Sequence, residues 1–136
     1  QTETKVIDPS KDPNDTFNLV EVTDNYANVR IDIASFPLYL RTKSGGKGKA
    51  RASGTIKVSD GINTHNLYQV SSSDNSENTF SIPALTYTFP SVPIYGKIRV
   101  FIHFAFDNRR GSNSGSMDVE LAINNWEVKI STVKTI

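Results

Sequence analysis

The sequence of 136 residues contains no cysteine, a single tryptophan, a single methionine and no long apolar run. The absence of cysteine excludes a disulfide scaffold, thiol catalysis and a zinc site with cysteine ligands. A transmembrane helix needs about 20 consecutive apolar residues, so the sequence predicts no membrane-spanning segment. Residue 1 is glutamine and no leader sequence follows it, which leaves open whether a leader has been removed.

Sequence motifs of the common enzyme classes are also missing. The chain has two histidines, His65 and His103, and it contains no HExxH, GxSxG, Walker or dinucleotide-binding pattern. A catalytic triad is a spatial arrangement, and a chain this rich in serine offers chance candidates that carry no weight. The sequence therefore predicts that the protein is not an enzyme.

Carboxylates near the C-terminus are the remaining enzyme signal, because glycosidases use a pair of them. They alternate along the chain at Asp118, Glu120 and Glu127. The same spacing suits the outward side of two strands, where acidic side chains pair with cations across a sheet. We expect these pairings to involve Lys97, Arg99 or Lys129.

Helical periodicity is absent, and short segments instead alternate apolar and polar side chains between turn residues. The clearest segment, residues 97–106, places one apolar residue at every second position: Ile98, Val100, Ile102, Phe104 and Phe106. Similar segments cover residues 17–22, 28–34, 38–40, 50–58, 65–70, 85–89, 117–123 and 126–130. About eight to ten short strands predict an all-β, single-domain antiparallel β-sandwich of jelly-roll or Ig-like topology, with no significant helix.

The N-terminal residues differ from the remainder of the chain. Residues 1–15 are polar and contain Pro9 and Pro13, which is typical of an arm or linker. We therefore expect an N-terminal arm at residues 1–15 and a β-sandwich domain at residues 16–136. A second interpretation makes residues 4–7 an added strand that pairs with another subunit.

Charge is distributed unevenly although the net charge is only +1. Residues 1–32 carry three cations and seven carboxylates, whereas residues 41–57 carry six cations and no carboxylate. The basic segment indicates either a solvated hairpin tip or a contact for a polyanion such as an acidic glycan or a lipid headgroup. Nucleic acid is the least favoured anion, because no aromatic side chains are interleaved with these cations.

The outward side of residues 97–106 also has an unusual composition, with Arg99, Phe101 and His103 at alternate positions. An aromatic ring between polar side chains is typical of surfaces that bind sugars or proteins. The candidate ligand-binding residues are Arg99, Phe101, His103, Arg41, Lys43, Lys47, Lys49, Arg109 and Arg110. Trp126 shares its alternation with Val128 and Ile130, and we expect it in the core.

No cofactor is predicted, with one exception. The acidic loops at residues 8–15 and 74–78 offer the oxygen ligands that calcium prefers, without the spacing of an EF-hand. A structural calcium ion is therefore a minor hypothesis.

The sequence favours a non-enzymatic binding or adhesion module, secreted or displayed at a cell surface. Its expected ligand is a glycan or another protein, contacted through loops and one sheet face. The alternative is a self-assembling structural subunit of a pilus, capsid, tail or coat. In that case the protein forms a homo-oligomer and its N-terminal arm makes the subunit contacts.

Overall fold

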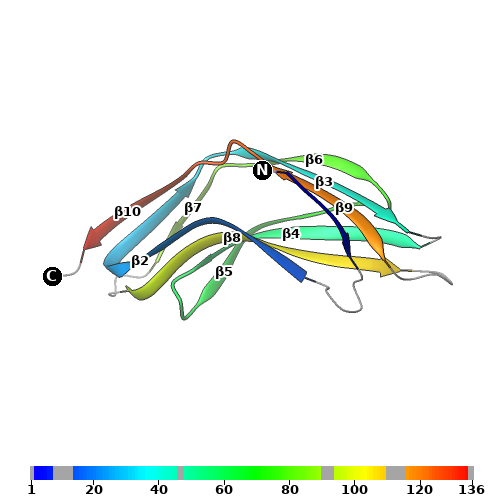
Figure 1. The fold of residues 1–136 in the computed structure, drawn as a ribbon. Coiled ribbons are helices and arrows are strands. Elements are labelled where there is room, and N and C mark those ends of the chain that lie inside the picture. The colour runs from blue at the N-terminus through cyan, green and yellow to red at the C-terminus, as the bar shows by residue number, and fades with distance from the viewer. Residues whose placement is uncertain (1, 8–13, 46–47, 90–93, 110–115, 135–136) are drawn as a thin grey trace.

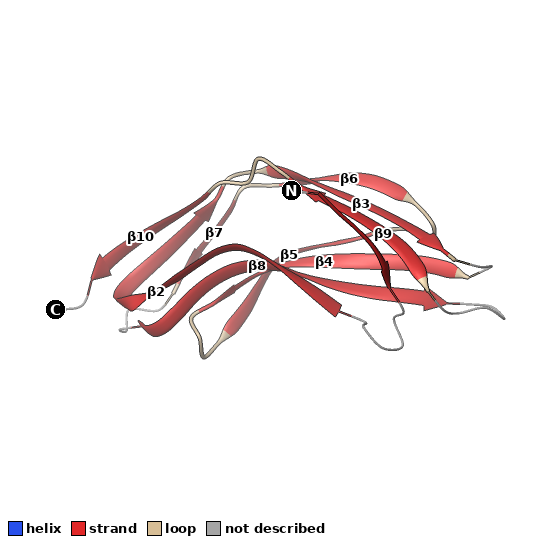
Figure 2. Ribbon diagram, viewed as in Figure 1, coloured by secondary structure: helices blue, strands red, loops and turns tan. Residues whose placement is uncertain are grey.

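A computed structural model describes residues 2–7, 14–45, 48–89, 94–109 and 116–134. These ranges contain ten β-strands and no helix, which confirms the all-β prediction. Figures 1 and 2 show how the strands are arranged. The strands are β1 (Thr2–Ile7), β2 (Asn14–Ile33), β3 (Phe36–Ser44), β4 (Lys49–Ser59), β5 (Thr64–Ser71), β6 (Glu77–Ile82), β7 (Leu85–Thr88), β8 (Ile94–Arg109), β9 (Met117–Ile123) and β10 (Val128–Lys134). In the same ranges, no helix is long and apolar enough to cross a membrane.

The strands form two antiparallel sheets that pack as a sandwich (Figure 1). The smaller sheet has the order β1-β9-β3-β6, and the larger sheet has the order β10-β2-β8-β4-β5. Strand β7 also pairs with β2 and precedes β8 along it, since Arg30 lies opposite Thr88 and Tyr26 lies opposite Ile94. The chain thus passes repeatedly from one sheet to the other.

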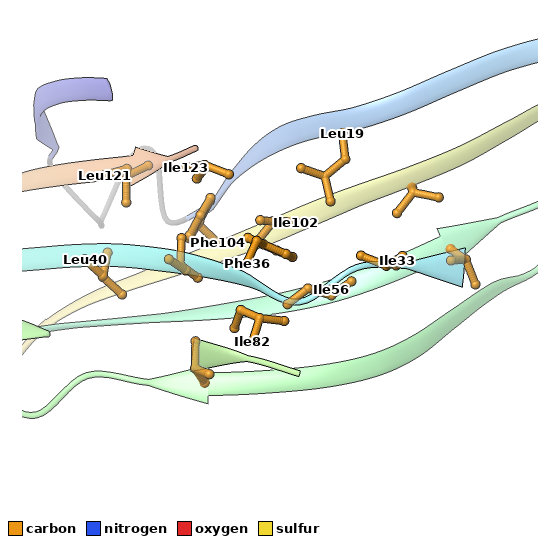
Figure 3. Packing of buried hydrophobic residues seen from close by; sticks show 14 of the residues in the cluster. Leu19, Ile33, Phe36, Leu40, Ile56, Ile82, Ile102, Phe104, Leu121 and Ile123 are labelled. Atoms are coloured by element: carbon orange, nitrogen blue, oxygen red, sulfur yellow. The ribbon is translucent and has the colours of Figure 1, made fainter. Parts of the chain in front are cut away.

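The core lies between the inward faces of the two sheets (Figure 3). Strand β8 contributes Ile98, Val100, Ile102, Phe104 and Phe106, all buried, which confirms the predicted inward side of this strand. Strands β3 and β9 cover them with Leu38, Leu40, Val119 and Leu121, also buried. Gly54 on β4 packs closely against this core, because a Cβ atom there would lie 3.2 Å from the Phe104 ring, a distance at which the ring would have to shift slightly.

Two turns have backbone geometry that suits their residues. Strands β4 and β5 are joined by a hairpin in which Gly61 has a φ of 93°. Asn125, in the turn before β10, has a φ of 59°, a conformation that asparagine tolerates better than most residues.

The first described residues of the N-terminal segment form a strand of the sandwich, whereas the sequence predicts an arm. Thr2–Ile7 is an edge strand that pairs with β9 of the same chain, and Asn14 and Asp15 begin β2. Residues 2–7 therefore complete the smaller sheet within one subunit.

Two other features differ from the sequence prediction. Residues 77–82 form a strand, β6, although the loop was expected to extend to residue 78 and no strand was expected beyond it. The segments 17–22 and 28–34 belong to one long strand, β2, whose first part pairs with β8 up to Tyr26 and whose last part pairs with β7 from Arg30 onward.

Trp126 lies at the margin of the core and not in its centre. The ring is half-buried, meets Phe17 edge to face at 5.4 Å, and donates from Nε1 to the carbonyl oxygen of Leu19 at 3.3 Å. The expectation of an inward tryptophan is thus met only in part, and the indole links the start of β10 to β2.

Candidate functional site

The outward face of β8 carries three of the candidate residues, and Arg99 is the most constrained of them. Its guanidinium carbon lies 4.4 Å from the centroid of the Phe101 ring. Its Nη2 donates to Asn18 Oδ1 at 2.9 Å, and its Nε lies 3.4 Å from a Glu21 carboxylate oxygen. Stacking and an ion pair from β2 together hold this cation flat against the sheet.

Phe101 lies beneath that cation and is only 8% exposed. A ring that serves as a platform for a sugar has to present its face to solvent. In this structure the Phe101 ring is covered by Arg99, and its role as a ligand contact stays a prediction of the sequence.

His103 is half-buried on the same face, between Thr16 of β2 and Thr55 of β4 in the strand register. Burial, and secondly the charge of Lys57, hold the pKa of His103 below its ordinary value of 6.5. The imidazole is therefore neutral at neutral pH and can both donate and accept a hydrogen bond.

Beyond His103, small side chains leave a hollow in the outward face. Ser53 of β4 lies between Ala105 of β8 and Ser71 of β5 in the strand register, and we call the hollow over these three residues the serine depression. Its volume is about 260 Å³, and it is lined by Arg51, Ala52, Ser53, Gln69, Ser71, Ser72, Ala105, Phe106 and Asp107.

One wall of the serine depression is charged. Arg51 Nη2 lies 3.5 Å from Asp107 Oδ2, and its Nε lies 3.5 Å from Asp74 Oδ1. The opposite side carries the Gln69 amide. The hollow thus combines a cation, a carboxylate, hydroxyls and an amide, which together donate and accept hydrogen bonds in several directions.

The basic segment does not form one patch among the residues that the structure describes. Arg41 and Lys43 lie on the outward side of β3 in the smaller sheet, whereas Lys49 lies on β4 in the larger sheet. Arg41 Nε donates to Glu120 Oε1 at 3.1 Å, and this hydrogen bond raises the pKa of Arg41. Lys43 lies opposite Asp118 in the strand register.

Three further candidates cannot be placed fully. Lys47 and Arg110 lie outside the described residues, and for Arg109 only the backbone is described, opposite Lys49.

The expected pairing of C-terminal carboxylates with β8 is wrong. Lys97 and Arg99 each lie 3.4 Å from Glu21 on β2, because β2 is the neighbour of β8. Glu120 belongs to β9 in the smaller sheet and pairs with Arg41 instead. The sequence thus predicts that cations on β8 pair with carboxylates, but it does not predict which strand supplies them.

The loop between β5 and β6 uses its polar side chains within the protein. Asn75 Oδ1 accepts from the backbone nitrogens of Ser44 at 2.9 Å and Ala50 at 3.1 Å, and its Nδ2 donates to the Gly48 carbonyl. Asp74 faces Arg51. Within the described ranges, no three histidine, aspartate or glutamate side chains are grouped to hold a metal ion; most of the other acidic loop, residues 8–13, lies outside these ranges.

Sequence reasoning did not identify the serine depression. Its floor comes from three strands that are distant in the sequence, and serine or alanine on a strand has no individual signature. The one available signal was Ala105, a small residue in the outward series between His103 and Asp107. Comparison with protein-family models and with curated proteins finds no match for this chain.

Proposed function

We propose that the protein is a non-enzymatic glycan-binding module that holds a sugar in the serine depression. The observation that carries the proposal is the shape and chemistry of this hollow. Its small floor residues, Ser53, Ser71 and Ala105, let a ring approach the sheet. The volume, about 260 Å³, is just below the roughly 300–1,000 Å³ of pockets for drug-sized ligands, which suits a small ligand such as one sugar unit.

The polar groups around the hollow match a sugar better than an apolar ligand. Each hydroxyl of a sugar both donates and accepts hydrogen bonds, and the walls offer Arg51 as a donor, Asp107 as an acceptor and Gln69 as both. His103 and Arg99 continue the same face at about 7 Å and 20 Å along β8 from Ala105, at the usual rise of a strand. These two residues are placed to contact further units of a longer glycan.

The strand order supports a jelly roll as the detailed topology. The orders β1-β9-β3-β6 and β2-β8-β4-β5 distribute eight strands over two sheets, and β10 is added beside β2. Lectin domains and viral capsid proteins both use this architecture, so the fold agrees with binding and with assembly. The choice between these classes therefore depends on surfaces and not on topology.

The test is a glycan array followed by calorimetry of the best-bound glycan. Ser53→Gln places a longer side chain in the middle of the hollow and should abolish binding. Ser81→Gln is the matched control, because Ser81 is an exposed serine on β6 in the smaller sheet, and it should bind as the wild type does. Absence of any bound glycan, or equal binding by both variants, would refute the proposal.

Secretion or display at a surface stays a prediction of the sequence, in keeping with an extracellular glycan ligand. The second candidate function, a self-assembling structural subunit, is favoured by one observation, the composition of the β5 edge.

A further inference from the structure

Among the described residues, the paths of the two sheets end in four edge strands, and β5 differs from the other three. The smaller sheet ends in β1 and β6, and the larger sheet ends in β10 and β5. Strands β1, β6 and β10 each contain at least one charged residue, whereas β5, with the sequence THNLYQVS, contains no Asp, Glu, Lys or Arg. Charges on edge strands prevent pairing with another chain, so β5 lacks the usual protection. Within the described ranges, strand β7 pairs only with β2 and is uncharged as well, but it has four residues against eight in β5, and shortness itself protects an edge strand.

Exposed apolar side chains gather at the same edge. Among the side chains that the structure describes, the large hydrophobic residues exposed by more than a third are Ile62, at 83%, and Tyr68, at 37%. Tyr68 lies on β5, and Ile62 lies in the hairpin that leads into it. Asp60 Oδ1 accepts from the backbone nitrogens of Ile62 at 2.9 Å and Asn63 at 2.7 Å, which holds the hairpin in one conformation.

We propose that β5 pairs with β5 of a second copy of this chain, so that the larger sheets of two protomers form one continuous sheet. A strand without charge meets no like charge when it pairs with itself, which makes a second copy the best-matched occupant. A twofold axis relates two antiparallel edge strands naturally, and it presents the same patch from both copies. Tyr68 and Ile62 are then covered by the partner.

The symmetry predicts which residues meet. The twofold axis of an antiparallel pair stands perpendicular to the sheet, so one residue near the middle of the strand lies opposite its own copy. The middle of β5 falls between Leu67 and Tyr68. Opposite residues in such pairs have Cα atoms about 4.5–5.5 Å apart, within the range that a disulfide bond spans.

A perpendicular axis also keeps the outward faces of both copies on the same side. If the proposed glycan site is correct, this dimer presents two serine depressions side by side on one surface. Two sites on a rigid sheet bind a repeating glycan more tightly than one site does. The dimer itself does not depend on glycan binding.

The first test uses the absence of native cysteine. The variants Leu67→Cys and Tyr68→Cys are purified separately and oxidised mildly. At least one of them should form a disulfide-linked dimer. Ser81→Cys, on the edge strand β6 of the smaller sheet, is the control and should form no disulfide-linked dimer, although it still dimerises through β5. Failure of both β5 variants to cross-link, or equal cross-linking of Ser81→Cys, would overturn the proposal.

The second test measures mass in solution by sedimentation equilibrium at several concentrations. The wild type should form a dimer, Tyr68→Lys should be monomeric, and Ser81→Lys should dimerise as the wild type does. Circular dichroism of each variant verifies the fold, and a wild type that is monomeric throughout contradicts the proposal. Binding of a single-site glycan to Tyr68→Lys should equal that of the wild type, which separates the failure of this interface from the failure of the glycan site.

Discussion

The two faces of β8 differ in what buries their side chains. The inward face buries Ile98, Val100, Ile102 and Phe104 completely against the opposite sheet. The outward face buries Phe101 almost as deeply, yet its ring is covered by Arg99 and flanked by residues of β2 and β4. Side chains on the inward face are buried by the packing of the two sheets, whereas Phe101 on the outward face is covered by the Arg99 side chain. Only the second arrangement leaves hydrogen-bonding groups at the surface for a ligand.

Truncation on the inward face should have the largest effect on stability. Phe104→Ala removes a fully buried ring from the centre of the sandwich and leaves a cavity beside Gly54. The free energy of unfolding should fall by about 3–5 kcal/mol, as for other buried aromatic residues. Denaturation in urea, monitored by circular dichroism, measures this change.

Truncation on the outward face should cost less and have a second consequence. Phe101→Ala should lower the free energy of unfolding by about 2 kcal/mol, because the ring is covered on its outer side by a single arginine that is itself partly exposed. It should also release Arg99 from its position and weaken binding of an extended glycan. An equal fall in the free energy of unfolding for Phe104→Ala and Phe101→Ala would contradict this contrast between the two faces.

The pH dependence of stability distinguishes the outward face further. The pKa of His103 is lowered, first by burial and then by Lys57, so the folded protein binds a proton there less readily than the unfolded chain. The contribution of His103 to stability is complete above the ordinary pKa of 6.5 and is lost as the pH falls through the lower folded pKa.

We therefore expect the free energy of unfolding to decrease as the pH falls from about 7 to about 5, in the range where histidine titrates. His103→Gln should remove this part of the decrease, and Lys57→Gln should reduce it by a smaller amount. Urea denaturation at a series of pH values provides the measurement. An identical pH profile for the wild type and His103→Gln would contradict the assignment.

The smallest expected effect concerns the shape of the cation on Phe101. Arg99→Lys keeps the positive charge near Glu21 but loses the planar group that stacks on the ring and donates to Asn18. Because the site is partly exposed, stability should change by less than about 1 kcal/mol. Thermal unfolding of Arg99→Lys and of the wild type, measured in parallel, checks this prediction. A larger loss of stability would contradict the small contribution assigned to the guanidinium.

The core side of β8 could be predicted from sequence because alternation is a local property of a strand. The partners of its outward side could not, since they depend on strand order: Glu21 lies far from Arg99 in the chain and adjacent to it in the sheet. Strand β6 was missed because only Phe80 and Ile82 alternate in it before Pro83 interrupts the pattern. The all-β class thus followed from local patterns.

The serine depression is a still less predictable feature, because it arises where three strands carry small side chains at the same level. Ser53, Ser71 and Ala105 resemble any surface residues until the registers of β4, β5 and β8 are known. The basic segment shows the opposite case, since a prominent sequence feature is divided between two sheets and partly neutralised by Glu120.

The most direct test of glycan binding at the serine depression is an NMR titration of the isotope-labelled protein with the glycan that an array identifies. The largest changes in backbone chemical shift should cluster at Ser53, Ser71 and Ala105, with smaller changes toward His103 and Arg99. Changes confined to the smaller sheet, around Arg41 and Lys43, would contradict the proposed site.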